Sequence, residues 1–394
     1  MGIRKFKADQ LFTGYEIKQE NPVLVTDTAG VIKDIIDIKD AGDDIEILTG
    51  LLTPGFINAH CHLELSHLKG LIPAGTGLVN FVQQVMTRRA ATEEEKLAAI
   101  EKAEQELYNS GTVAVGDICN TADTIAVKQK SKLRFHNFIE VSGFVDTAAG
   151  KRFSDAQALA SQFAICNLQF AISPHAPYSV SKTLFSLLND ATAGQLITIH
   201  NQETAAEDQL YKSKEGGFLE LYKNFNIDIS GFEPTGKSSL QSWSPYFTNS
   251  QSIILVHNSF IAAGDIEFVK IQNLKSKIQN FFCVCINANK YIEKKIPPFD
   301  LLREKNSTIV IGTDSYASNG QLNMLEEIKA IQNETAKTIP LQEILKWATI
   351  NGANALQMET TLGSFEKDKQ PGLVLIDKMD GQSIAADAIA KRIL

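Results

Sequence analysis

The sequence predicts an α/β protein: a (β/α)8 barrel of the TIM type with a small β-sandwich domain built from both chain ends. From Gly55 onward, eight short β-rich runs alternate with helical patterns over about 300 residues, the size and repeat of such a barrel. Before Gly55 and after Leu362, the chain has short strands without a helical period. Most of the histidines stand at predicted strand ends, which converge on one cavity in a barrel.

The first 54 residues predict a small β unit. Its strands are expected at Ala8–Phe12, Pro22–Thr26, Val31–Ile36 and Ile45–Leu48, and the turn Thr53-Pro54-Gly55 ends the unit. The tail after Gly363 returns to strand, with Leu373–Asp377 as its clearest run, and is too short to fold alone. We therefore expect residues 1–54 and 363–394 to form one composite domain, and residues 55–362 to form the barrel.

The barrel strands are expected at the β-rich runs Phe56–His62, Thr112–Cys119, Arg134–Ser142, Leu168–Pro174, Leu196–Asn201, Ile253–Asn258, Phe281–Ile286 and Thr308–Asp314. Thr92–Ser110 and Ser181–Ala191 suit amphipathic helices, and Leu341–Leu356 suits a helical pair. The connections 63–90 and 204–252 are unusually long. Such long loops in a compact domain usually serve function, so both are predicted to be lids.

Charge and composition narrow the class of protein. A net charge of −8 and an isoelectric point near 5.5 argue against nucleic acid or an anionic membrane as the main partner. No run of about 18 apolar residues predicts a membrane-spanning helix, and the charged segment Met1–Gln10 lacks the apolar core of a signal peptide. Five scattered cysteines fit reduced thiols, and Cys283-x-Cys285 fits strand packing better than a zinc site. We expect a cytoplasmic protein.

The histidines predict a metal site. His60 and His62 are two apart on the first barrel strand and so face the same side. Three more histidines and an aspartate follow or end later strands, namely His175, His200, His257 and Asp314, whereas His67 and His136 lie off this pattern. Three neutral imidazoles and one carboxylate would suit one divalent ion, most readily zinc, with Fe(II) or Mn(II) as alternatives.

Glu203 is the predicted proton shuttle. It follows His200 by three residues, in the loop that leaves the fifth strand. A metal ion lowers the pKa of a bound water, and a carboxylate at this place could carry the released proton. The alternative is that Glu203 only caps the following helix in Glu203-Thr204-Ala205-Ala206-Glu207.

Five motifs resemble the amidohydrolase superfamily: Pro54–His62, Ser173–Ser179, His200–Thr204, Leu255–His257 and Gly312–Ser315. The closest branch is the mononuclear aminohydrolases, which include the cytosine, guanine, S-adenosylhomocysteine and aminodeoxyfutalosine deaminases and the related triazine chlorohydrolases. The resemblance covers nearly the whole chain. Its motifs are specific for the superfamily and much less so for the substrate.

The resemblance implies roles for individual residues. His60, His62, His200 and Asp314 would be the metal ligands, and His257 and Asp314 would hold the attacking hydroxide. Glu203 would move its proton to the leaving nitrogen, and His175 would line the substrate pocket. Binuclear members carry a lysine at the end of strand 4, and this strand ends Ser173-Pro174-His175, so one metal ion is expected.

Two segments bear on the substrate. The family commonly ends strand 7 with Cys-Pro-x-Ser-Asn, and this chain departs from that pattern at Cys283–Asn289. After the first motif, Leu63–His67 resembles the aminodeoxyfutalosine-deaminase-like group, which makes Glu64 and His67 candidate substrate contacts. For His67, a surface loop histidine is an equally good interpretation.

These observations predict a hydrolase that deaminates an aminated heterocycle, a purine nucleoside-like compound such as an aminodeoxyfutalosine or adenosine derivative. Attack by metal-bound hydroxide would release ammonia. The alternatives are hydrolysis of another C–N or C–Cl bond and a non-catalytic barrel that serves assembly. The expected partner is a small molecule. Related barrels often form homodimers, and nothing in the sequence fixes the oligomeric state.

Overall fold

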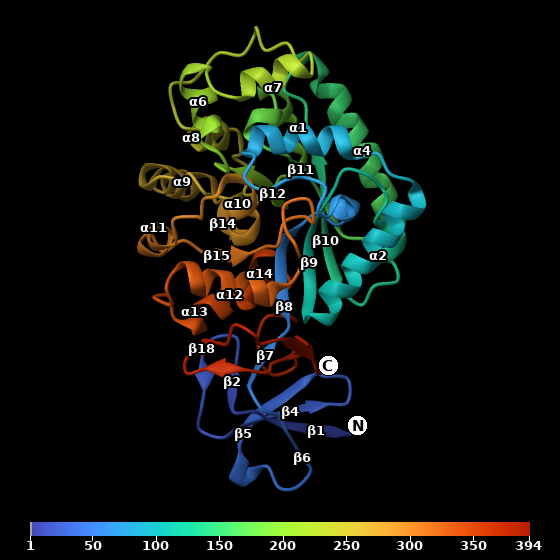
Figure 1. Ribbon diagram of the computed structural model, residues 1–394, viewed down its shortest axis with the longest axis vertical. Helices are drawn as coiled ribbons and strands as arrows, with labels where there is room; N and C mark the ends of the chain where they lie inside the picture. Colours follow the sequence, from blue (N-terminus) through green and yellow to red (C-terminus); the bar gives the residue numbers. More distant parts are fainter. Residues whose placement is uncertain (1) are drawn as a thin grey trace.

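The computed structural model describes residues 2–394 and shows two regions along its long axis (Figure 1). Strands from the two chain ends, blue and red in the figure, lie side by side at one end. The remainder of the molecule is the α/β part, whose strands are surrounded by helices. Both chain ends lie in the β-rich region.

Within residues 2–394, the α/β part contains eight strands that pair in parallel, as two four-stranded sheets ordered β11-β10-β9-β8 and β12-β13-β14-β15. They are β8 (Phe56–Cys61), β9 (Thr112–Cys119), β10 (Arg134–Val141), β11 (Phe170–Pro174), β12 (Leu196–Asn201), β13 (Ser252–His257), β14 (Gln279–Val284) and β15 (Ile309–Ile311). The prediction of a β/α alternation with parallel strands is confirmed. Strand 8 is shorter than expected, and Asp314 lies beyond it in an isolated bridge to Cys61.

The two sheets meet at both of their edges. On one side, the backbone N–H of His200 in β12 donates to the carbonyl of His175 just after β11, at 2.9 Å. On the other side, the N–H groups of Thr313 and Asp314 donate to the carbonyl of His60 in β8, at 3.1 Å each. These bonds bring the carboxyl ends of β8, β12 and β15 into one neighbourhood.

Helices flank the strands, and some of them begin at a side-chain cap. In α2, the Thr92 hydroxyl accepts from the Glu95 N–H while the Glu95 carboxylate accepts from the Thr92 N–H, a capping box. Ser181 caps α5 in the simpler way, by accepting from Leu184 N–H. The α-helices are α1 (Leu78–Arg88), α2 (Glu93–Asn109), α3 (Ile125–Lys128), α4 (Ala149–Ile165), α5 (Lys182–Ala191), α6 (Ala205–Ser213), α7 (Phe218–Asn224), α8 (Ser239–Trp243), α9 (Ala263–Ser276), α10 (Ile286–Glu293), α11 (Phe299–Glu304), α12 (Met324–Glu334), α13 (Leu341–Ala348) and α14 (Ile350–Ala355).

The two long connections carry helices. Residues 63–90 form the 3-10 helix η2 (Leu63–Leu68) and α1, and residues 204–252 form α6, α7, α8 and the 3-10 helix η5 (Ser244–Tyr246). Their apolar side chains share a cluster that includes Leu78, Leu210 and Phe218. The remaining 3-10 helices are η1 (Ile38–Asp40), η3 (Asp146–Ala148) and η4 (Pro177–Ser179).

The β-rich end contains one sheet from the N-terminal segment alone, ordered β5-β4-β1-β6, and one from both chain ends, ordered β19-β16-β7-β2-β3. The C-terminal tail therefore pairs with the N-terminal strands, as predicted. A buried cluster that includes Phe6, Leu24, Leu52 and Leu373 joins residues of the two sheets. The strands are β1 (Ile3–Lys7), β2 (Gln10–Phe12), β3 (Ile17–Lys18), β4 (Pro22–Asp27), β5 (Ile32–Asp37), β6 (Ile45–Ile47), β7 (Leu51–Pro54), β16 (Leu373–Ile376) and β19 (Ala390–Arg392), with the hairpin β17 (Met379–Asp380) and β18 (Ser383–Ile384).

The predicted turn at Thr53-Pro54-Gly55 is wrong. Thr53 and Pro54 belong to β7, where Pro54 pairs with Leu373 of β16, and the Gly55 N–H donates to the Pro371 carbonyl at 3.1 Å. The pairing of β7 with β2 ends at Leu52, so Pro54 has a strand partner only on the β16 side. The chain therefore passes almost directly from the composite sheet into β8.

None of the helices in the described residues has the length and apolar character that crossing a bilayer requires.

Acid sensitivity is expected from His136, a buried side chain of β10. Burial lowers the pKa of His136 to about 4, so the ring stays neutral in the folded protein at pH values where it would be charged in the unfolded chain. As the pH falls from about 6.5 to 4, only the unfolded state takes up this proton, and the free energy of unfolding falls by about 3 kcal/mol.

We predict that His136→Leu removes this contribution. Urea unfolding at pH 7 and pH 4 should show a smaller loss of stability in the variant than in the wild type. His67→Leu is the control, because the His67 ring is only half-buried. Parallel pH profiles for wild type and His136→Leu would contradict the assignment.

Candidate active site

The site begins where β8 and β15 meet. Gly312 makes the close approach possible, because a Cβ at this position would lie 2.8 Å from both the Cβ and the carbonyl oxygen of His60. Beside it, the Asn58 amide donates to Thr313 Oγ1 at 2.8 Å and accepts from the Thr313 N–H at 3.1 Å. Asp314 is thereby held next to His60, although 254 positions separate them in the chain.

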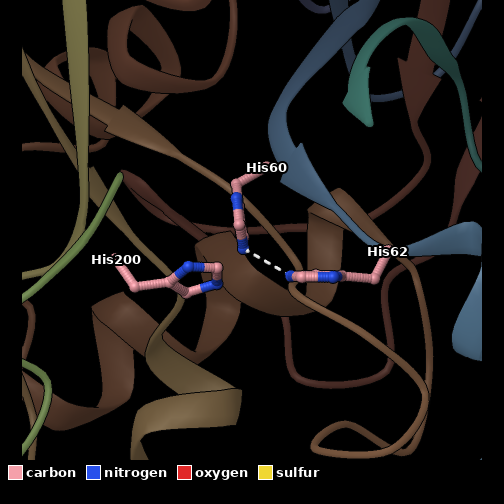
Figure 2. A group of neighbouring side chains, drawn as sticks. All are labelled: His60, His62 and His200. Carbon is pink, nitrogen blue, oxygen red and sulfur yellow. Dashed lines mark hydrogen bonds between the residues drawn. The ribbon is translucent and has the colours of Figure 1, made fainter. Parts of the chain in front are cut away.

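Three histidines and Asp314 converge here. Figure 2 shows the rings of His60, His62 and His200 pointing toward one another, with 3.1 Å between Nε2 of His60 and Nε2 of His62. Asp314 Oδ1 lies 3.6 Å from His60 Nε2 and 3.4 Å from His62 Nε2. Each of the three rings offers a nitrogen within 4.8 Å of the others. The structure thus brings together the four predicted metal ligands.

The hydrogen bonds and charges of this group suit a metal ion. His200 Nδ1 lies 2.8 Å from the His175 carbonyl oxygen, which fixes the proton on Nδ1 and leaves the Nε2 lone pair free. Burial lowers the pKa of His60 and His62 well below the usual value, so both rings are neutral, as ligands must be. Neighbouring ligands around a tetrahedral zinc ion are about 3.3 Å apart, close to the separations seen here.

Glu203 and His257 face each other beside this group, with 3.5 Å between Glu203 Oε1 and His257 Nε2. Thr204, not Glu203, caps α6 with its side chain, so the alternative role for Glu203 as the helix cap is wrong. Burial, reinforced by the negative charges of Asp314 and Glu207, raises the pKa of Glu203 well above the usual value. A buried carboxyl group whose neutral form is favoured in this way can hold a proton and pass it to a neighbouring group.

Two further residues hold this pair. The Glu207 carboxylate accepts from the backbone N–H of Gln202 at 2.9 Å and of Glu203 at 2.8 Å, which fixes the loop that carries Glu203. The Asn289 amide nitrogen lies 3.3 Å from His257 Nδ1 and can donate to it, which leaves the ring proton on Nε2, toward Glu203. Asn289 lies in the segment where the sequence departs from the family pattern, and its role was missed because α10 brings it back to the site.

The backbone around the site is unusual. His257 and Asp314 adopt left-handed φ angles of 76° and 58°, and Gln202 adopts 44°. Non-glycine residues rarely take such values, which cost free energy and cluster at functional sites. The bonds from Asn58, Glu207 and the neighbouring strands hold these residues in place.

A cavity of about 350 Å³ opens above the histidines. Its polar lining, called the polar wall below, includes Glu64, Arg89, Asn120 and Glu140. Its apolar lining, called the apolar wall, comes largely from α1 and α7 in the long connections, with Phe81, Val85, Met86, Leu221 and Tyr222 among its residues. The predicted role of the long connections in covering the site agrees with this position.

Glu64 lines the polar wall and is almost fully buried. One oxygen accepts from the N–H groups of Asn120 and Thr121 at 2.8 and 3.0 Å, and the other pairs with Arg89 at 3.0 Å. Burial nevertheless raises the pKa of Glu64 to about 7. Glu140 stands beside it, bound by the Asn120 side chain at 2.9 Å. Glu140 was not predicted, because a lone glutamate near the end of a strand carries no distinctive pattern.

The structure separates the remaining two candidates. His175 lines the cavity, bonds Ser179 Oγ at 2.7 Å and has its pKa lowered to about 4 by burial. In the described part of the chain, His67 lies outside this cavity, with its Nε2 3.2 Å from the Arg89 carbonyl oxygen. His67 therefore does not join the group of site residues.

The chain is similar to several characterised proteins. It is 27% identical to an adenosine deaminase of Helicobacter pylori over 82% of this chain and 78% of that protein. It is 26% identical to a 5-methylthioadenosine/S-adenosylhomocysteine deaminase of Thermoanaerobacter pseudethanolicus over 92% and 83%.

Solved structures share the fold. An aminofutalosine deaminase of Helicobacter pylori, in complex with methylthio-coformycin, aligns with a TM-score of 0.81 at 22% identity, over 99% of this chain and 100% of that one. An adenosine deaminase of Xanthomonas campestris with bound zinc aligns at 0.74 and 21% identity, over 95% and 84%. Residues 51–391, nearly the whole chain, match the family model itself, and the chain therefore belongs to the amidohydrolase family.

Proposed function

We propose that this chain is a metal-dependent aminohydrolase that removes an amino group, as ammonia, from a purine nucleoside-like compound. The observation that carries the proposal is the pair Glu203 and His257 beside three converging histidines and Asp314. The deaminase relatives support it, since they are similar to this chain over most of its length.

His60, His62, His200 and Asp314 would hold one divalent ion, for which we propose zinc. Imidazole nitrogens with a carboxylate suit zinc, and a zinc-bound structure shares the fold. When bound, the ion lowers the pKa of a water ligand and so supplies hydroxide near neutral pH.

Side chains of this protein would transfer the protons and orient the attacking water. Glu203 takes the proton that the attacking water releases and delivers it to the leaving nitrogen, and its raised pKa suits both steps. His257 orients the attacking oxygen through the Nε2 proton that Asn289 leaves on that nitrogen. Water adds to the amidine carbon, the C–N bond breaks, and a carbonyl and ammonia result.

The cavity supports a nucleoside over a free base. Its volume of about 350 Å³ exceeds the needs of a purine ring alone, and its polar wall at Glu64 can accept hydrogen bonds from sugar hydroxyls. The apolar wall from α1 and α7 suits an apolar substituent at the 5′ carbon. We therefore favour nucleosides that carry such a group in place of the 5′ hydroxyl.

The finer architecture is part of the proposal. The backbone bonds at both edges of the two parallel sheets support one closed (β/α)8 barrel over residues 55–362. The buried cluster between the two β sheets supports a sandwich domain from residues 1–54 and 363–394. The cytoplasmic location stays a prediction from the sequence, which does not fix the oligomeric state.

Ammonia release tests the proposed function. We expect the purified protein to release ammonia from adenosine-type nucleosides, and Glu203→Gln to lower kcat by about a thousandfold, because the amide cannot carry the proton. Metal content, measured by elemental analysis, should stay at the wild-type level in this variant. Cleavage of chlorotriazines without ammonia release from any nucleoside would instead support the C–Cl alternative.

Metal binding has its own prediction. The wild-type protein should contain about one divalent ion per chain, and His200→Ala should lower its affinity at least tenfold, because one of four donors is lost. His67→Ala is the matched control and should bind as tightly as the wild type, since His67 lies outside the site. Equal metal binding by the two alanine variants would refute the ligand set.

Substrate preference should depend on the apolar wall. Val85→Thr keeps the side-chain shape and puts a hydroxyl on the cavity wall, so kcat/KM for 5′-methylthioadenosine should fall about tenfold more than for adenosine. Val79→Thr on the same helix is the control. Val79 packs against the same apolar cluster as Val85, but Val79 is not part of the cavity lining. An equal loss for both nucleosides would place the 5′ group elsewhere.

A further inference from the structure

A buried lysine lies against the strand β9. Lys128, the last residue of α3, has a fully buried side chain whose Nζ lies 2.5 Å from Asp117 Oδ2, 2.6 Å from Asn137 Oδ1 and 3.1 Å from Cys119 Sγ. The rings of Phe135 and Phe163 lie 5.3 and 5.5 Å from the same nitrogen. The proposed chemistry gives this lysine no part.

Asp117, which pairs with Lys128 through one carboxylate oxygen, contacts the segment next to His62 through the other. Asp117 is a fully buried residue of β9, and its Oδ1 accepts from the backbone N–H of Leu63 at 2.9 Å. Leu63 directly follows His62, which lies one residue beyond the end of β8. The ladder of β8 therefore ends before His62, and the Asp117 carboxylate holds the chain just after it.

The residues after β9 also bind the Glu64 side chain. Asn120 and Thr121, just beyond β9, donate their backbone N–H groups to the Glu64 carboxylate. Residues 117–121 thus fix residues 62–64 twice, at the Leu63 amide and at the Glu64 side chain. This segment carries one of the proposed metal ligands and the acidic group of the polar wall.

The charge of Lys128 explains how Asp117 keeps its place. A carboxylate without a partner is costly to bury in the core, and it would turn toward water. Beside Lys128, the Asp117 carboxylate offers one oxygen to the lysine and the other to Leu63. Stability alone is a weak reason for such a pair, because apolar replacements of buried pairs are often neutral or stabilising.

We propose that Lys128 is a positioning residue for the metal site, acting through Asp117 on the segment His62–Glu64. The proposal rests on the proposed function, since it assumes that His62 is a ligand. Partners that orient metal ligands typically contribute about 10- to 100-fold to metal affinity.

Cobalt binding tests the proposal without any turnover. Apoprotein is titrated with Co(II) against a competing chelator, the visible absorption of the bound ion is recorded, and thermal unfolding is followed in parallel. Lys128→Met should bind Co(II) about tenfold more weakly than the wild type and show an altered spectrum. Lys329→Met is the matched control, because Lys329 is also buried and bonds the carbonyls of Ala386 and Ala388 in the C-terminal tail.

A second pair of variants covers the case in which Lys128→Met does not fold. Asp117→Asn/Lys128→Met and Asp117→Ala/Lys128→Met both remove the two charges, and only the first keeps an acceptor for the Leu63 N–H. We expect the asparagine variant to bind Co(II) within about threefold of the wild type and the alanine variant about tenfold more weakly.

Equal affinities for these two double variants would overturn the proposal, as would an equal loss in Lys128→Met and Lys329→Met. If the wild-type apoprotein itself bound no Co(II), the proposed function would fail and this inference with it. Tight wild-type binding with no effect of any Lys128 variant would refute the inference alone.

Discussion

The meeting of β8 and β15 is the constraint on which the site depends. The carbonyl of His60 accepts the N–H groups of Thr313 and Asp314, and Asn58 binds Thr313 through both ends of its amide. Gly312 allows this approach because any side chain there would collide with His60. If these strands separated, Asp314 would leave the histidines, and the left-handed backbone at Asp314 would lose the bonds that hold it.

Burial gives the site its chemistry. Removal from water disfavours charge, so it lowers the pKa of His60 and His62 and raises that of Glu203. Neutral imidazoles can donate lone pairs to a metal ion, and a carboxyl with a raised pKa can hold a proton and pass it on. Glu207 acts on the site indirectly, because it holds the backbone of Glu203 and adds negative charge beside the Glu203 carboxyl group.

The floor and the walls of the cavity have different origins. The floor comes from strand ends, where the three converging histidines and Asp314 lie. The apolar wall comes from α1 and α7, which belong to the two long connections and not to the regular β/α alternation. Chemistry and substrate preference can therefore change separately, because the connections tolerate substitution more readily than the strand ends do.

Sequence patterns were sufficient for the β/α alternation and for the residues that converge, because period-two strands and histidines at their ends are local features of the chain. They could not show that Thr53 and Pro54 continue a strand, since that depends on pairing with Leu373. They also missed Glu140 and the role of Asn289. For His67 they left a substrate contact and a surface loop position equally open, and the ring lies at the Arg89 carbonyl, outside the cavity lining. The sequence determines the type of each reactive group and its position in the chain. Only the tertiary structure decides the partners of these groups, their protonation and their distance from the cavity, because contacts between distant segments set the burial and hydrogen bonding of each group.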